Sequence, residues 1–351
     1  MSRFFSRKYD ALTPYVPGEQ PGDQQYVKLN TNENPFPPSP KALLYARDHT
    51  RSPEKYSDPE GVELRRALSF LYGVKPEEIV LTNGSDEVLN FAFMAFCDEE
   101  MPALFPDISY GFYPVFAQLN HVPYEEIPLT EDFSVDLEEY KKRRGTVFLA
   151  NPNAPTGKAL PAAAIEALAA ADPDRIVVVD EAYVDFGAES CVPLVEKYEN
   201  LLVIQTFSKS RSLAGARLGY AIACPALIAD LNTIKFSTNP YNINSCSMAI
   251  GMGSLLDDGY NKANCRTIAE NRTYTVQKLK SLGFEVVESA ANFVFARHPD
   301  ISGQEIYEKL KENGVLVRHF TKERIRDYNR ITIGTKAQMD VLFETFTKIW
   351  G

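Results

Sequence analysis

The chain has 351 residues, of which 44% are hydrophobic and 24% are charged, and its formal net charge is -10. This size and composition fit a globular protein of two domains, or one large domain with a smaller lobe. The acidic balance, without a basic tract, argues against binding to nucleic acid or to anionic membranes.

The cysteines and histidines indicate neither disulfides nor a metal. The five cysteines are scattered and form no CxxC pair, and the four histidines show no metal-ligand spacing. The first residues contain no apolar signal sequence, and no apolar run is long enough to cross a membrane. We therefore expect a reduced, cytoplasmic protein.

The N-terminal part, to about residue 40, is rich in proline and glycine, which predicts an extended arm. Tyr26, Leu29 and Phe36 would anchor this arm, and residues 32–35 supply hydrogen-bonding side chains. Beyond a turn at 56–59, apolar residues at helical spacing predict a helix over 62–71 that ends at Gly73.

A strand over 78–82, a glycine turn and an apolar-periodic segment over 88–94 come next. This order predicts a helix start at Ser85 and Asp86, whose free N–H groups can bind a phosphate. A Ser/Asp N-cap without any ligand explains the same pattern equally well.

The middle of the chain predicts an α/β fold. Strands are expected over 103–105, 121–129, 146–150, 175–179 and 201–204, with an aromatic turn over 109–113 and a helix over 162–171. Continuous Val and Ile runs between helices predict a mostly parallel sheet covered on both faces. Ligands bind such sheets beyond the carboxyl ends of the strands. Asp180, Lys209 and the loop 151–157 follow three strands, so we expect them at one rim.

The C-terminal part predicts a second, smaller α+β domain. A helical pattern runs from about 249 to 282, and strands follow over 284–287, 292–296, 315–318 and 330–333, with helices from 302 and 336. We place an arm at 1–40 that packs with the small domain or a dimer partner, a large domain at 41–250 and the small domain at 251–351.

Lys209 is the central candidate residue. It follows a buried strand and lies among Ser208, Ser210, Arg211 and Arg217. A lysine among hydroxyls and cations suits a Schiff base with an aldehyde cofactor whose phosphate the neighbours hold. Neighbouring positive charge lowers the pKa of the amine and makes it more nucleophilic. Taken alone, a solvated basic loop explains this stretch about equally well.

Three motifs together resemble the fold-type I pyridoxal-phosphate aminotransferases over nearly the whole chain: Asn151-Pro-Asn-Ala-Pro-Thr-Gly157, Asp180-Glu-Ala-Tyr183, and Ser208-Lys209 followed by 213–220. Residues 13–18, 29–40 and 330–335 narrow the resemblance to the histidinol-phosphate aminotransferases. It implies pyridoxal 5'-phosphate as cofactor and a homodimer. It also implies transamination of L-histidinol phosphate with 2-oxoglutarate, giving imidazole-acetol phosphate and L-glutamate in histidine biosynthesis.

The resemblance also implies roles for single residues. Lys209 would form the imine with the cofactor and would move the proton between the substrate Cα and C4′ of the cofactor. Asp180 would face the pyridine nitrogen of the cofactor, and Tyr183 would contact its O3′. The other implied cofactor contacts are Ser85, Asp86, Ser208 and Arg217 at the phosphate, Tyr110 against the ring, and Tyr56 from the neighbouring subunit. The implied substrate contacts are Arg330 and Arg318, which bind an anionic group, and Tyr15.

Each role has a plainer structural alternative. Asp180 can be a helix N-cap, Tyr110 a core aromatic, and Arg318 or Arg330 an exposed charge at a strand end. The sequence also departs from the family pattern, because Ala154 stands where an asparagine that contacts O3′ is usual. Asn153 takes over that contact, or Tyr183 makes it alone.

Three other functions compete with this reading. A threonine-phosphate decarboxylase and an aromatic amino-acid aminotransferase would share the fold and the cofactor. A non-catalytic regulator that binds the same cofactor would need a DNA-binding helix-turn-helix, for which the chain has neither room nor charge.

Overall fold

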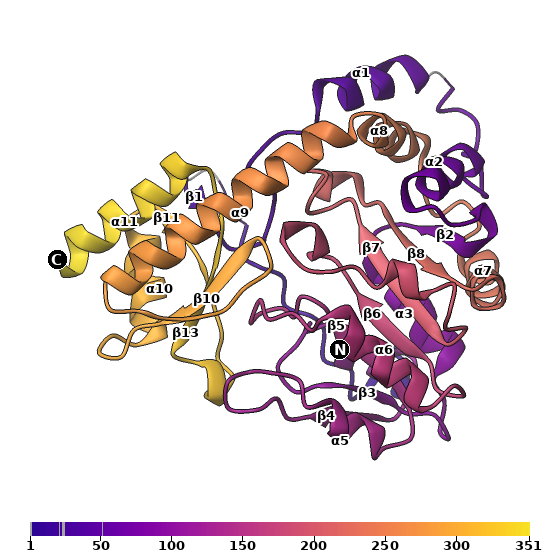
Figure 1. Ribbon diagram of the computed structural model, residues 1–351, viewed down its shortest axis with the longest axis horizontal. Coiled ribbons are helices and arrows are strands. Elements are labelled where there is room, and N and C mark those ends of the chain that lie inside the picture. The colour runs from indigo at the N-terminus through magenta and orange to yellow at the C-terminus, as the bar shows by residue number, and fades with distance from the viewer. Residues whose placement is uncertain (1, 21, 23–24, 51) are drawn as a thin grey trace.

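The computed structural model describes residues 2–20, 22, 25–50 and 52–351. A seven-stranded sheet forms the centre of the larger lobe, with the strand order β2-β8-β7-β6-β5-β3-β4 (Figure 1). All neighbouring pairs are parallel except those of β8, which is antiparallel to β2 and β7. The predicted α/β fold with a mostly parallel sheet is therefore confirmed. The strands are β2 (Ile79–Thr82), β3 (Ala103–Pro106), β4 (Tyr124–Ile127), β5 (Thr146–Ala150), β6 (Val177–Asp180), β7 (Leu201–Thr206) and β8 (Gly219–Ala223).

Both faces of this sheet are buried, as continuous apolar strands require. Along β6, Val177 and Val179 pack into one core with Ile165, whereas Val178 packs into the other core with Phe93. The helices of this lobe are α1 (Pro40–His49), α2 (Val62–Tyr72), α3 (Ser85–Phe96), α4 (Tyr113–Leu119), α5 (Leu137–Lys141), α6 (Ala162–Ala171), α7 (Pro225–Thr238) and α8 (Ser245–Leu255).

The smaller lobe is built on an antiparallel sheet with the order β12-β13-β10-β9. The long helix α9 leads into it from the larger lobe (Figure 1). The elements are α9 (Asp258–Ser281), β9 (Glu285–Val287), β10 (Phe293–Arg297), α10 (Gly303–Glu312), β11 (Val315–Leu316), β12 (Arg318–His319), β13 (Tyr328–Thr332) and α11 (Lys336–Trp350).

The N-terminal arm is tied to the smaller lobe. Its strand β1 (Val27–Lys28) pairs in parallel with β11, and Leu29 is buried in the core of that lobe. The predicted domain boundary after residue 250 would cut α8, and the boundaries stay a prediction. Short 3-10 helices lie at Arg7–Tyr9, Pro76–Glu78, Val184–Phe186, Val192–Leu194, Ala214–Ala216 and Glu323–Ile325.

Several predicted elements need correction. The strand expected over 121–129 is limited to β4, because His121 has a left-handed backbone with φ 55°. The helix expected from 249 to 282 is two helices, with a break at 256–257. Helices α1, α4 and α5 were not predicted.

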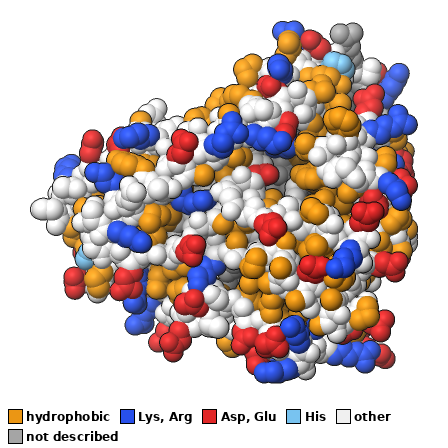
Figure 2. Space-filling model, in the orientation of Figure 1, with side chains coloured by type: hydrophobic (Ala, Val, Ile, Leu, Met, Phe, Trp, Pro, Cys, Tyr) orange, Lys and Arg blue, Asp and Glu red, His pale blue; other side chains and the backbone are white. Residues whose placement is uncertain are grey.

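The molecular surface mixes both signs of charge. Figure 2 shows acidic and basic side chains interspersed over the face seen in Figure 1. Among the described residues, every helix is too short or too polar to span a lipid bilayer.

Candidate active site

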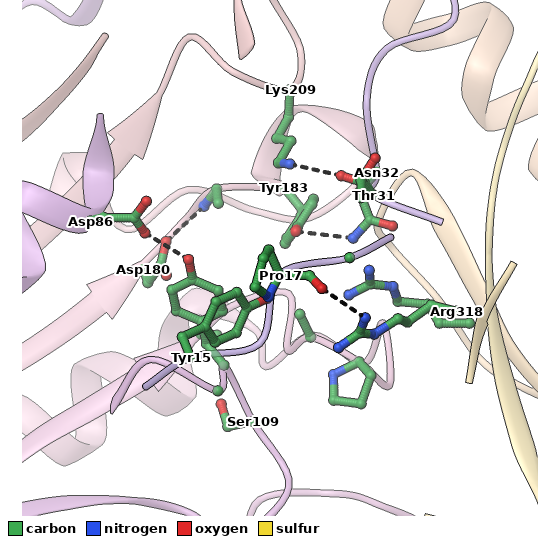
Figure 3. Close-up of a pocket in the computed structure, with 18 of the residues that line it drawn as sticks. Tyr15, Pro17, Thr31, Asn32, Asp86, Ser109, Asp180, Tyr183, Lys209 and Arg318 are labelled. Atoms are coloured by element: carbon green, nitrogen blue, oxygen red, sulfur yellow. Dashed lines mark hydrogen bonds between the residues drawn. The ribbon is translucent and has the colours of Figure 1, made fainter. Parts of the chain in front are cut away.

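A cavity of about 480 Å³ lies beyond the carboxyl ends of β5, β6 and β7, and residues of the arm and of the smaller lobe also line it (Figure 3). The polar residues that line it come from all three parts of the chain. They include Tyr15, Thr31, Asn32, Ser85, Asp86, Ser109, Tyr110, Asp180, Tyr183, Ser208, Lys209, Arg217, Arg318, Lys322 and Arg330.

Lys209 reaches this cavity from the loop that follows the fully buried strand β7. Its Nζ donates a hydrogen bond to the carbonyl of Thr31 at 3.2 Å and lies 5.9 Å from the ring centroid of Tyr183. Burial lowers the pKa of Lys209 to about 8, and the positive charge of Arg330 acts in the same direction. A larger share of this amine is therefore uncharged and nucleophilic near neutral pH than for an ordinary lysine.

Asp180 lies at the end of the neighbouring strand β6, paired in register with Ile204 of β7. Its side chain is only 5% exposed, and Oδ1 accepts a hydrogen bond from the N–H of Ala182 at 3.1 Å. Burial raises the pKa of Asp180 to about 7, and the Ala182 N–H opposes that rise. A buried carboxylate of this kind favours a protonated ring nitrogen as its partner.

The N-terminus of α3 lines one end of the cavity and can bind an anion there, so we call it the anion-binding end. Gly84 precedes the helix with φ 79°, and no side chain caps the first N–H groups, which belong to Ser85 and Asp86. A Cβ at Gly219 of β8 would lie 2.4 Å from the nitrogen of Ser85, so only glycine allows this close approach. Free N–H groups and the helix dipole together favour a phosphate.

The side chain of Asp86 adds contacts that the motif did not predict. Its Oδ1 accepts the hydroxyl proton of Tyr110 at 2.6 Å, and its Oδ2 accepts Nη2 of Arg217 at 3.0 Å. Elsewhere on the cavity wall, Thr206 Oγ1 donates a hydrogen bond to Ser208 Oγ at 3.0 Å. The carboxylate therefore orients both an aromatic ring and a guanidinium toward the anion-binding end.

Tyr183 is held by the arm. Its hydroxyl accepts a hydrogen bond from Asn32 Nδ2 at 3.0 Å, and Asn32 Oδ1 accepts Thr332 Oγ1 at 3.0 Å. Burial raises the pKa of Tyr183, whereas Arg330 and Asn32 lower it. The sequence marked Asn32 as a hydrogen-bonding residue without a role, and the contact of the Thr31 carbonyl with Lys209 was missed.

Two arginines of the smaller lobe face each other across paired strands. Arg318 of β12 is directly opposite Arg330 of β13. Arg330 Nη2 donates to the carbonyl of Asn30 at 2.8 Å, while its buried Nε has no hydrogen-bond partner among the residues that the structure describes. Within the described ranges, neither arginine forms an ion pair. Like charges directly opposite repel, so this arrangement favours an anionic group that both arginines share.

Tyr15 of the arm covers one wall of the cavity. Its ring stacks on Phe112 at a centroid distance of 4.2 Å. A Cβ at Gly111 would lie 3.3 Å from the same ring, so the arm runs close over the aromatic turn.

Two predicted site residues do not line the cavity. Tyr56 is 82% exposed and stacks on Tyr241 at a centroid distance of 4.3 Å. Asn153 is buried, and its amide is used within the protein: it donates to the Ile108 carbonyl at 3.0 Å and accepts from Ser109 at 2.8 Å. Ala154 and Pro155 form this part of the cavity wall instead.

The cavity residues fit an aromatic aldehyde that carries a phosphate. Lys209 offers a buried amine of lowered pKa, Asp180 a buried carboxylate, and the start of α3 an uncapped set of N–H groups. Ser208 and Arg217 line the same end. The arginine pair lines the same cavity, and its guanidinium groups can bind a second anion.

The chain is similar to known aminotransferases in sequence and in structure. Residues 24–346 match the model of the family "Aminotransferase class I and II". The chain is 47% identical to histidinol-phosphate aminotransferase 1 of Bradyrhizobium diazoefficiens, over 99% of this chain and 100% of that protein. The structure of histidinol-phosphate aminotransferase from Sinorhizobium meliloti, in complex with pyridoxal-5'-phosphate, superposes with a TM-score of 0.89 at 25% identity, over 99% of both chains. L-threonine-O-3-phosphate decarboxylase from Porphyromonas gingivalis shares the fold with a TM-score of 0.80 at 22% identity, over 92% of this chain and 99% of that chain.

Proposed function

The chain belongs to the class I and II aminotransferases, and we propose how its own residues serve the chemistry of that family. It is a pyridoxal-phosphate-dependent enzyme that transaminates L-histidinol phosphate, a step of histidine biosynthesis. We propose 2-oxoglutarate as the amino acceptor, which gives imidazole-acetol phosphate and L-glutamate. The observation that carries the assignment is that one cavity is lined by the Lys209 amine, the Asp180 carboxylate and an arginine pair for which the described residues provide no carboxylate partner.

The proposed roles follow from position and charge. When bound, the cofactor supplies an electron-withdrawing ring that stabilises negative charge on the substrate carbon. Asp180 would hold the proton on the ring nitrogen, since its carboxylate is buried at the end of β6. Ser85, Asp86, Ser208 and Arg217 would hold the phosphate.

Lys209 is the proposed proton carrier. As the free amine, its Nζ would take the proton from Cα of the amino donor, and as the ammonium it would return a proton in the second half of the reaction. The Thr31 carbonyl, 3.2 Å from Nζ, would accept a hydrogen bond from either form and so orient the group. Tyr183 and Tyr110 would enclose the reacting atoms and limit the access of water.

Arg330 and Arg318 are proposed to bind the anion of each substrate in turn. Histidinol phosphate presents a phosphate and glutamate a carboxylate, and an arginine fork binds either group with two hydrogen bonds. Tyr15, which lines the cavity and stacks on Phe112, is proposed as a further substrate contact.

A panel of amino donors tests this assignment. L-histidinol phosphate, phenylalanine, tyrosine and phosphothreonine are each assayed with 2-oxoglutarate, while glutamate formation and carbon dioxide release are measured. We expect histidinol phosphate to give the highest kcat/KM, with glutamate as product. Release of carbon dioxide from phosphothreonine without glutamate would instead identify the decarboxylase, whose fold this chain shares.

A homodimer is also proposed, with Tyr56 contacting the cofactor phosphate of the neighbouring subunit. Tyr56 and Tyr241 form a stacked, solvent-exposed aromatic pair that a partner chain would cover. Light scattering on the intact protein tests the oligomeric state, and Tyr56→Ala is expected to weaken cofactor binding.

A cytoplasmic location is proposed because five cysteines are free thiols: Cys97, Cys191, Cys224, Cys246 and Cys265.

A further inference from the structure

The residue after Asp180 carries a second buried carboxylate that points away from the cavity. Successive side chains along a strand point to opposite faces. Asp180 lines the cavity, whereas Glu181 is 1% exposed within the protein. Its Oε1 accepts the N–H of Cys191 at 2.5 Å, and its Oε2 accepts Ser190 Oγ at 2.7 Å and Gln205 Nε2 at 2.8 Å.

The orientation of the Gln205 amide is set by two tyrosines. Gln205 Oε1 lies 2.6 and 2.8 Å from the hydroxyls of Tyr72 and Tyr220, which also share a hydrogen bond of 2.6 Å with each other. One hydroxyl donates to the other, and the remaining proton is donated to Oε1, which leaves the NH₂ group to face Glu181. The carboxylate of Glu181 is thus surrounded by three donors, and its ionised form accepts all of them.

The electrostatic surroundings of Glu181 are unusual for a buried acid. In the part of the chain that the structure describes, Glu181 forms hydrogen bonds but no ion pair with a cation. Burial raises the pKa of Glu181 to about 7, and the three donors oppose that rise. The charge of Glu181 is also among the causes that raise the pKa of Asp180. The titratable groups that face this cluster are Asp180 at the end of β6, the Cys191 thiol with Glu189 near it, and the phenols of Tyr72 and Tyr220, with Arg211 and Asp185 near the tyrosines.

We propose that Glu181 is a positioning residue that acts through Asp180. Its hydrogen bonds to Ser190, Cys191 and Gln205 tie the end of β6 to β7 and to the following loop, and so hold the Asp180 carboxylate in place. Its charge adds a second negative charge behind the site, which favours the protonated state of the cofactor ring nitrogen and of the cofactor's linkage to Lys209. This inference rests on the proposed function.

The test is a pH titration of the visible absorption band of the holoenzyme, in the wild type and in Glu181→Gln. The substitution keeps the shape but removes the charge, so protonated forms in the site are less stable. We expect the midpoint of the band to fall by roughly half a pH unit or more. We also expect kcat to fall roughly tenfold while KM for histidinol phosphate changes less than twofold, because Glu181 does not contact substrate. Glu196→Gln, which neutralises an exposed acid of the same region, is the matched control and should titrate like the wild type.

The outcomes separate this proposal from the assignment of function. If Glu181→Gln retains the wild-type midpoint and kcat, the role of Glu181 is refuted while the enzyme assignment stands. If the wild type neither binds pyridoxal phosphate nor forms glutamate, the proposed function itself fails. Should Glu181→Gln not fold, Ser190→Ala removes one donor, makes the charged form of Glu181 less stable, and should lower the midpoint by a smaller amount. An unchanged midpoint in folded Ser190→Ala would then overturn the proposal.

Discussion

Replacing Arg330 with glutamine should weaken the binding of both amino donors, histidinol phosphate and glutamate. The guanidinium lies in the cavity opposite Arg318, and its Nη2 donates to the Asn30 carbonyl, whereas the described part of the chain offers its buried Nε no hydrogen-bond partner. A hydrogen bond to a charged group contributes about 1.5–3 kcal/mol. Because about 1.4 kcal/mol corresponds to a factor of ten, losing one such bond raises KM about 10- to 150-fold.

The same substitution has a second consequence at Lys209. The charge of Arg330 is one cause of the lowered pKa of Lys209, so its removal should raise that pKa. Arg330→Lys keeps the charge but loses the fork, and should give an intermediate KM with a smaller change in pKa. The double variant Arg318→Gln/Arg330→Gln, compared with the two single variants, measures the coupling energy between the two arginines in binding one anion.

Steady-state kinetics for each half-reaction, with KM and kcat determined separately, is the assay. Arg297→Gln is the control, because Arg297 lies on the same sheet but is paired with Glu285 outside the cavity. A rise in KM for only one of the two amino donors would refute the shared anion site. An unchanged KM for both would remove Arg330 from the site altogether.

Three further predictions concern the cofactor site. The rate of pyridoxal phosphate binding to the cofactor-free protein should rise with pH through about 8, because Lys209 loses its proton there, and a rate independent of pH would contradict this prediction. Since the pKa of Lys209 in the folded protein lies below its value in the unfolded chain, the contribution of Lys209 to the free energy of unfolding should also increase as pH rises above 8. Gly219→Ala should weaken cofactor affinity about 5- to 150-fold, because the added Cβ would be forced against the nitrogen of Ser85. Gly215→Ala, which places its Cβ in open space, should leave the affinity unchanged, and equal affinities of the two variants in a fluorescence titration would refute the close approach of Gly219 to Ser85. Asp180→Asn should bind the cofactor but lose about 10²- to 10³-fold in kcat, and a loss under threefold would exclude Asp180 from the charge stabilisation.

The sequence predicted the sheet well because its strands are buried on both faces. Every residue of the strands β5, β6 and β7 is buried, each strand contains a continuous apolar run, and each predicted run overlaps the observed strand. The helices α4 and α5 were missed because they have only seven and five residues, too few for a helical period to be distinct. The break between α8 and α9 lies within continuous helical spacing, so periodicity alone did not locate it.

The sequence predicted those residues of the candidate site whose side chains are themselves reactive or charged. Lys209 and Asp180 line one cavity, as their positions at the ends of strands suggested, and Arg330, which the family resemblance implied, lines the same cavity. The Thr31 carbonyl at Lys209 could not be predicted, because every residue has a carbonyl and only the path of the arm selects this one. The path of the arm also brings the Asn32 amide within hydrogen-bond distance of the Tyr183 hydroxyl. The Asn153 amide donates to the Ile108 carbonyl and therefore does not face the cavity.

Trapping the cofactor tests the central claim most directly. The holoenzyme is reduced with sodium borohydride, digested, and mapped by mass spectrometry for a lysine that carries the pyridoxyl group. We predict the modification at Lys209 and its loss in Lys209→Ala with the fold retained by circular dichroism. Modification of another lysine, or wild-type turnover in Lys209→Ala, would contradict the assignment.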